Sequence, residues 1–167
     1  MLYFLDTEFY EDGKTIDLIS IGLVDANGRE FYACNLDAQL HRVHDANDTW
    51  MRDNVLAQLP LYSDKAWMSR RQICLKLESY IRSEPGDDII PEFWGYYADY
   101  DWVVLCQLFG CMVDLPKGWP MYCNDLKQLC VSVGNPKLPK QIDEHHALTD
   151  ARWIRDMYEL LITERRL

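Results

Sequence analysis

Residues 2–24, with the sequence LYFLDTEFYEDGKTIDLISIGLV, decide the fold class of this 167-residue chain. The first apolar run, Leu2–Phe9, alternates imperfectly, and the second, Asp17–Val24, is nearly continuous, as expected for a strand buried on both faces. The dipeptide Asn27-Gly28, which is typical of a tight hairpin, comes next, and Arg29–Asn35 is interpreted as the returning strand. The chain is therefore expected to open with three antiparallel strands.

The rest of the chain alternates helical and extended patterns. Apolar spacing and capping residues predict five helices, which lie at 49–59, from Ser69 to Pro85-Gly86, from Asp99 to Phe109, from Asn124 to Gly134, and along the stripe of Ala147, Ala151, Ile154, Tyr158 and Leu161. Two further strands are expected at Ile89–Tyr96 and Met121–Cys123. This order predicts an α/β fold with a mixed five-stranded sheet and helices on both faces. Because no repeat, low-complexity segment or linker interrupts the sequence, residues 1–167 are expected to form a single domain.

Composition excludes several classes of protein. With 49% hydrophobic and 26% charged residues, the chain has the composition of a folded domain, and no run of about 18 apolar residues indicates a membrane span. The N-terminal segment carries Asp6 and Glu8 and lacks a basic region, so it is unlike a signal peptide, and we expect a cytoplasmic protein. Six cysteines without a CxxC pair argue against a zinc ribbon.

The net charge also bears on the class of partner. Seventeen basic and 27 acidic residues give a formal charge of −10, whereas proteins that bind nucleic acid are usually basic. A cluster of carboxylates that binds divalent cations would, however, invert the local field. The charge alone therefore leaves a nucleic-acid substrate open.

Asp6 and Glu8 form the first candidate site. Residues two apart in a strand point to the same face, so the two carboxylates of Asp6-Thr7-Glu8 are expected side by side. Two adjacent ionised carboxylates repel each other unless a cation lies between them, and Mg²⁺ prefers such oxygen ligands. A metal site competes here with a solvated strand end.

Two further acids and a histidine stand at the starts of predicted helices. Asp101 lies in the first turn after Ile89–Tyr96, where the helix dipole alone could explain an acid, and Asp99 competes with it as cap or functional group. His145 precedes the last helix, and Asp150 lies off that helix's buried stripe. A lone histidine is more often a capping or surface residue, but an imidazole can also act as a base at neutral pH.

Taken together, the DxE, YD and HxAxxD motifs resemble the DEDDh group of 3′–5′ exonucleases, which belong to the DnaQ-like, RNase H-like superfamily. The resemblance implies an RNase H-like fold in which four carboxylates hold two Mg²⁺ or Mn²⁺ ions, namely Asp6, Glu8, Asp101 and Asp150. It implies that His145 is the general base and that each cycle releases a 5′-mononucleotide. Many members carry Asn four residues before the second-motif acid, where this chain has Tyr97.

Three stretches resemble the RNase AS family of polyadenylate-specific 3′-exoribonucleases more narrowly. They are DTEFYEDGKTIDLISIGLV from Asp6, CQLFG after Asp101, and HHALTDA from His145. This resemblance implies that the substrate is the 3′ end of single-stranded RNA, that adenylate is preferred, and that the protein works as a homodimer. The six tryptophans and ten tyrosines are consistent with an aromatic surface for a partner.

Substrate contacts are expected next to the metal motifs. Phe9 and Trp102 could stack on terminal bases, or both could be core aromatics, while Thr7 and Ser20 could offer hydrogen bonds. Lysines 137 and 140 could meet a phosphate or be solvated. Three alternatives to an exoribonuclease remain: a DNA-directed proofreading or repair exonuclease, a non-catalytic nucleic-acid-binding module, and a protein-interaction domain with a solvated acidic face.

Overall fold

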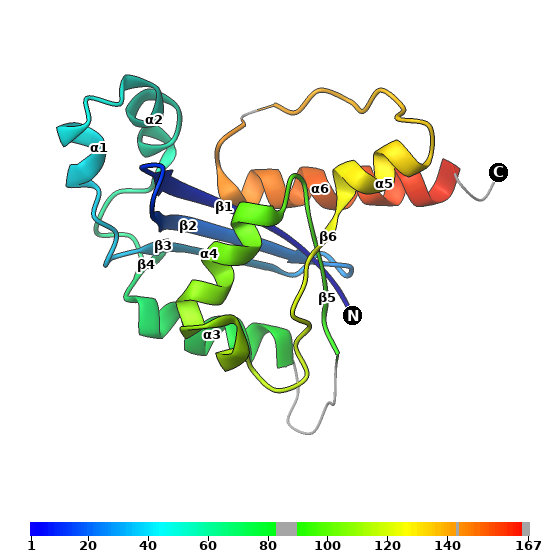
Figure 1. The fold of residues 1–167 in the computed structure, drawn as a ribbon, viewed down its shortest axis with the longest axis horizontal. Helices are drawn as coiled ribbons and strands as arrows, with labels where there is room; N and C mark the ends of the chain where they lie inside the picture. Colours follow the sequence, from blue (N-terminus) through cyan, green and yellow to red (C-terminus); the bar gives the residue numbers. More distant parts are fainter. Residues whose placement is uncertain (83–89, 143, 165–167) are drawn as a thin grey trace.

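A mixed six-stranded sheet forms the centre of the molecule (Figure 1), in a computed structural model that describes residues 1–82, 90–142 and 144–164. The strands lie in the order β4-β3-β2-β1-β5-β6, with bounds β1 Leu2–Glu11, β2 Ile16–Asp25, β3 Glu30–Asn35, β4 Trp67–Met68, β5 Glu92–Gly95 and β6 Asn124–Asp125. Strands β1, β2 and β3 are antiparallel, as predicted, whereas β4, β5 and β6 each run parallel to their neighbour.

The prediction of five strands is wrong by one. Trp67–Met68 is a two-residue strand on β3, too short to produce an alternating pattern that the sequence could reveal. The strand expected at Met121–Cys123 lies instead at Asn124–Asp125, where it pairs with Trp94 and Gly95 of β5. The predicted start of the preceding strand at Ile89 falls outside the described residues.

Helices cover both faces of the sheet, as predicted (Figure 1). They are α1 His41–Asp45, α2 Thr49–Asn54, α3 Arg70–Arg82, α4 Asp99–Phe109, α5 Leu126–Ser132 and α6 Ala147–Glu164, with 3-10 turns η1 Leu56–Gln58 and η2 Met112–Asp114. The figure places α5 and α6 on one face and α3 and α4 on the other. No helix in the described part of the chain is long and apolar enough to span a membrane.

The helix starts confirm one predicted cap and correct two. Ser69 and Gln72 form the predicted capping box, in which the Ser69 amide donates to the Gln72 side chain at 2.9 Å. The α5 cap is Asp125 rather than Asn124, and its carboxylate accepts from the Gln128 amide. Asp99 is the first residue of α4 and caps nothing. The helix expected at 49–59 is split into α2 and η1, and the predicted stop at Pro85-Gly86 lies outside the described residues.

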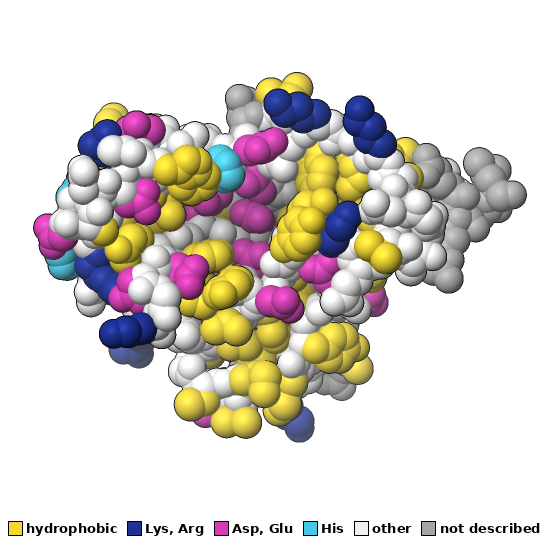
Figure 2. All heavy atoms as spheres, turned by 45° about the horizontal axis from the view of Figure 1, so that its top comes forward, with side chains coloured by type: hydrophobic (Ala, Val, Ile, Leu, Met, Phe, Trp, Pro, Cys, Tyr) yellow, Lys and Arg dark blue, Asp and Glu magenta, His cyan; other side chains and the backbone are white. Residues whose placement is uncertain are grey.

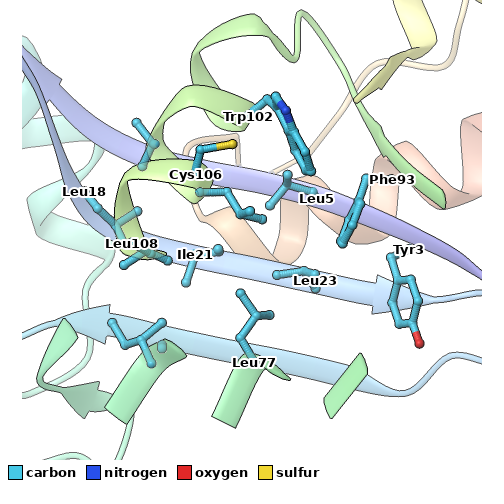
Figure 3. Close-up of a cluster of buried hydrophobic side chains, with 14 of the residues drawn as sticks. Tyr3, Leu5, Leu18, Ile21, Leu23, Leu77, Phe93, Trp102, Cys106 and Leu108 are labelled. Carbon is cyan, nitrogen blue, oxygen red and sulfur yellow. The ribbon is translucent and has the colours of Figure 1, made fainter. Parts of the chain in front are cut away.

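Strand β1 separates two hydrophobic cores, because alternate side chains point to opposite faces. Tyr3 and Leu5 pack with α3 and α4, where Figure 3 shows Leu77 and Trp102 meeting the sheet. Phe4 packs on the other face with the apolar residues of α5 and α6. Asp6 and Glu8 lie two and four residues after Phe4 in β1, so their side chains point to the same face of the sheet as Phe4. The acidic pair therefore faces α6 at the end of that second core.

Candidate active site

Three carboxylates from two elements meet at one point. Asp6 and Glu8 come from β1 and Asp150 from the first turns of α6, and one oxygen from each lies within 4.8 Å of the others. Glu8 is only 8% exposed, although a glutamate in an ordinary environment carries a negative charge at neutral pH. The structure thus brings together three of the four predicted ligands, in an arrangement suited to a cation.

Gly22 allows α6 to reach this point. It pairs with Asp6 across the β1–β2 ladder, and a β-carbon on Gly22 would lie 2.4 Å from the backbone of Ala147 and Leu148. Since no real β-carbon approaches backbone so closely, only glycine lets the start of α6 rest directly on β2. Asp150, one turn further along α6, is thereby held over the acidic pair of β1.

Asp101 stands beside the group of three rather than in it. It projects from the first turn of α4 and is 6% exposed. The backbone amide and the hydroxyl of Thr7 both donate to one oxygen of Asp101, at 2.9 and 2.6 Å. The Thr7 hydroxyl, which was expected to offer a hydrogen bond to a substrate, is in this structure used inside the protein to hold Asp101.

Burial raises the pKa of all four carboxyl groups, and the charges of the neighbouring acids of the cluster add to this for Asp6 and Glu8. Burial is the main cause of the raised pKa of Asp6, followed by the charges of Asp101, Asp150 and Glu8. The pKa of Glu8 rises to about 8 through burial and the charges of Asp150 and Asp101. Burial also raises the pKa of Asp101 and of Asp150 to about 6, against the lowering effect of the hydrogen bonds that each accepts. A bound cation would offset this cost of ionisation.

His145 and His146 have different surroundings. His145 adopts a left-handed backbone conformation with φ of 74°, and its amide donates to Asp150 at 3.0 Å. Its ring meets Trp50 of α2 edge to face, with 4.9 Å between ring centroids. His146 instead stacks on Tyr32 of β3 at 4.7 Å, and burial lowers its pKa. Of the two histidines, it is therefore His145 that is placed beside the carboxylates.

A cavity of about 790 Å³ opens next to the acids. Asp6, His145 and Asp150 line one end, and the rest is lined by the β5–α4 turn, α5, α6 and the segment between those two helices. Figure 2 shows acidic side chains gathered along a hollow between hydrophobic walls. Lysines 127, 137 and 140 also line the cavity, so the acids face a basic wall.

The other predicted substrate contacts are mostly internal. Trp102 is 8% exposed and packs against Phe93 in the core of Figure 3, which favours the core alternative. Ser20 lies opposite Glu8 in the sheet under α6 and is only 1% exposed, so its hydroxyl is buried in this structure. Phe9 is half-buried and stacks on the exposed Tyr100 at 5.7 Å, so this pair keeps an open aromatic face.

Sequence reasoning missed Gly22 and Trp50, and it singled out Tyr97 only as a departure from a family pattern. The roles of Gly22 and Trp50 depend on contacts with residues more than 90 positions away, which no local pattern encodes. Tyr97 lines the cavity with φ of 57°, a conformation in which asparagine is common and tyrosine rare. The departure from the family's asparagine at this position was the one signal that the sequence offered.

Comparison with known proteins identifies one family and two relatives that match this chain. The sequence model of one family, described as the 3′-5′ exoribonuclease Rv2179c-like domain, matches residues 1–162. The chain is also 44% identical over 153 residues to two named proteins of Mycobacterium tuberculosis, 3′-5′ exoribonuclease Rv2179c of strain ATCC 25618 / H37Rv and 3′-5′ exoribonuclease MT2234.1 of strain CDC 1551 / Oshkosh. The alignments cover 91% of this chain and 88% of each relative.

Proposed function

This chain belongs to the family of 3′-5′ exoribonuclease Rv2179c-like domains, and from that premise we propose that it is a divalent-metal-dependent 3′-5′ exoribonuclease that releases 5′-mononucleotides. The observation that carries the proposal is the convergence of Asp6, Glu8 and Asp150, with one oxygen of each within 4.8 Å of the others. They meet at the end of a cavity that His145 also lines. A solvated acidic face would not bury Glu8 or hold Asp101 beside Asp6.

The donor set fits hard divalent cations such as Mg²⁺ or Mn²⁺. Every candidate ligand is a carboxylate oxygen, and the raised pKa of each group reflects a cost that a cation would remove. Asp6, Glu8 and Asp150 would hold one ion, and Asp101 would supply a carboxylate for a second ion. Bound in this way, two ions would neutralise phosphoryl oxygens, favour deprotonation of a water and stabilise the leaving oxygen.

The protein's own residues position the reaction and move its protons. His145 accepts the proton that the attacking water loses, while the water oxygen forms a bond to phosphorus. The bond from phosphorus to the 3′-oxygen of the penultimate nucleotide breaks, that oxygen takes up a proton from solvent, and His145 releases its proton to solvent. Trp50 fixes the plane of the His145 ring, and the bond from the His145 amide to Asp150 fixes its backbone. The products are a 5′-mononucleotide and an RNA that is one residue shorter.

Two finer points of the proposal rest on resemblance to the RNase AS family. We infer that the 3′ end of single-stranded RNA is the substrate and that adenylate is the preferred terminal nucleotide. The two relatives are named exoribonucleases, which supports RNA over DNA as the substrate.

The test is digestion of 5′-labelled 20-mers of A, U and C, as RNA and as DNA, with Mg²⁺ or with EDTA. We expect a ladder of single-nucleotide steps from the 3′ end of RNA, fastest for A and absent in EDTA. Asp150→Ala should remove activity, whereas Asp156→Ala, an exposed acid on the same helix, should not. Cleavage in EDTA, degradation from the 5′ end, or equal turnover of DNA would overturn the corresponding part of the proposal.

A further inference from the structure

Tyr97 occupies a strained position at the edge of the cavity. Its backbone φ is 57°, in the left-handed region that aromatic residues rarely adopt, yet its side chain is 62% exposed. The Tyr97 ring meets Tyr96 edge to face at 4.7 Å, and Tyr96 in turn meets Trp153 of α6 at 5.2 Å. Backbone strain tends to persist where function requires it. The strained backbone of Tyr97 therefore indicates that its exposed ring contacts a ligand.

Three lysines share the cavity with Tyr97. Lys127 comes from α5, and Lys137 and Lys140 come from the segment that joins α5 to α6. They are three of only seven lysines in a chain of net charge −10. Lys127 donates to the side chain of Asn135 at 2.8 Å, and none of the three makes an ion pair with a carboxylate in the part of the chain that the structure describes. Their charges are therefore available to an anion.

We propose that this cavity binds the RNA strand on the 5′ side of the scissile phosphate, with Tyr97 stacked on a base and the three lysines close to phosphates. The inference rests on the proposed exonuclease function, and it identifies the part of the RNA substrate that lies along Tyr97 and the three lysines. Aromatic stacking combined with a basic track is the usual way in which proteins bind single strands without reading their sequence. A volume of about 790 Å³ is typical of a ligand pocket.

Charge decides between the two ends of the substrate. The terminal nucleotide brings one phosphate, the scissile one, and that phosphate must lie at the carboxylates. Three ammonium groups along one wall have partners only if further phosphates follow, and these exist only on the 5′ side. The half-buried Phe9 and the exposed Tyr100 lie outside the residues that line this cavity and leave room for the terminal base elsewhere.

The experiment compares kcat and KM for oligoadenylates of two, four, six and ten residues. Tyr97→Asn removes the ring but suits the left-handed backbone, so the variant should melt no lower than the wild type. Its KM for the oligoadenylates should rise about 5- to 150-fold, the usual effect of one lost stacking contact, with little change for the p-nitrophenyl ester of adenosine 5′-monophosphate, which has no base on the 5′ side of its scissile phosphate. Tyr97→Phe should behave as the wild type, and so should Tyr122→Asn, which removes an exposed tyrosine outside the cavity.

The lysines are tested by salt dependence. Binding of fluorescein-labelled ten-residue oligoadenylate is followed by anisotropy in an Asp150→Asn background, so that no cleavage interferes. Each of Lys127→Ala, Lys137→Ala and Lys140→Ala should reduce the slope of log affinity against log salt by about 0.7, the value for one phosphate contact on a single strand. Lys117→Ala, an exposed lysine outside the cavity, should leave the slope unchanged.

The outcomes separate this inference from the proposed function. An unchanged KM of Tyr97→Asn for long substrates, or an equal rise for the p-nitrophenyl ester, would overturn the assignment to the 5′ side, and unchanged salt slopes would overturn the role of the lysines. Failure of the wild type to hydrolyse RNA of any length would overturn the proposed function. The anisotropy measurement would still show whether the cavity binds the oligoadenylate.

Discussion

The backbone of Ala147 lies against the face of Gly22 on which a side chain would stand, and a β-carbon there would come within 2.4 Å of the Ala147 carbonyl carbon. Gly22 is the cross-strand partner of Asp6, so this contact sets how far α6 stands from the acidic pair on β1. The position of Asp150 relative to Asp6 therefore depends on a residue that carries no side chain at all.

Gly22→Ala should damage both stability and the acid cluster. The added methyl group must push α6 away from β2, and overpacking of this kind costs about 1–3 kcal/mol of the free energy of unfolding. Because Asp150 moves with α6, the affinity for Mn²⁺ measured by calorimetric titration should fall as well. Gly13→Ala is the matched control: its φ of 79° also disfavours alanine, but its surroundings are open and it lies outside the cluster. Equal Mn²⁺ affinities for the two variants would contradict the positioning role of Gly22.

The raised pKa of Glu8 predicts how stability depends on pH without metal. Its pKa of about 8 in the folded protein exceeds the ordinary value of about 4.3, so the folded state holds the proton more tightly. The resulting stabilisation is complete below about pH 4 and is lost as the pH rises through about 8. In EDTA, Glu8→Gln should therefore melt higher than the wild type at pH 8 and at the same temperature near pH 4.

The same measurement contains its own controls. Each kcal/mol corresponds to about 2–4 °C in the melting temperature of a chain this size. Added Mn²⁺ should reverse the order at pH 8, because only the wild type keeps the full set of carboxylates. Glu159→Gln, an exposed acid of α6, should show no such difference. A Glu8→Gln protein that melts lower than the wild type in EDTA at pH 8 would refute the electrostatic account.

Local patterns explain why much of the fold could be predicted. The opening strands are long apolar runs and α6 has a helical apolar stripe, and the positions of these elements are confirmed. Two-residue strands such as β4 and β6 have no periodicity, because their pairing is imposed by the neighbouring strand. The cap of α5 moved from Asn124 to Asp125, since the two residues are equally good caps on local grounds, whereas α4 follows Ala98 without a side-chain cap, which no local preference predicts.

The candidate site, like the fold, could be predicted from the sequence only in part. The two-residue spacing of Asp6 and Glu8 was sufficient to place them together, whereas the position of Asp150 near them was implied only by the family resemblance of the motif around His145. The sequence could not show that Thr7 and Ser20 are buried, because strand parity gives a face but not what covers it. For the same reason the sequence left two interpretations of Trp102, a base-stacking residue or a core aromatic. Its packing against Phe93 favours the core aromatic.

Thr7 should act through Asp101. Thr7→Val keeps the shape and the backbone amide bond but removes the hydroxyl that donates to Asp101 at 2.6 Å. A buried carboxylate that loses one of its donors should cost about 1–3 kcal/mol in urea unfolding at pH 8. Thr7→Ser restores the hydroxyl and should recover most of the loss. If both variants lose the same stability, the methyl packing of Thr7 matters rather than its hydrogen bond.

The protein is expected to be a homodimer, chiefly because it resembles the RNase AS family. Several large apolar side chains are exposed, and a partner could cover them, among them Leu61 at 82% and Tyr62 at 66%. Sedimentation velocity at micromolar concentration should give a mass near twice 19.7 kDa. A single species with the mass of one chain would exclude a stable dimer under those conditions.

The last prediction separates His145 from its neighbour. His145→Asn suits a φ of 74° and keeps the amide that bonds to Asp150, but it removes the base. Its kcat on RNA should fall about 10²- to 10⁴-fold, the usual contribution of a positioned base, while its Mn²⁺ affinity should stay unchanged because the ring is not a proposed ligand. His146→Asn loses the stacking contact with Tyr32, so it should melt lower but keep kcat within a few-fold. The assignment fails if His146→Asn is the inactive variant, and it also fails if His145→Asn no longer binds Mn²⁺, since the histidine would then be a ligand.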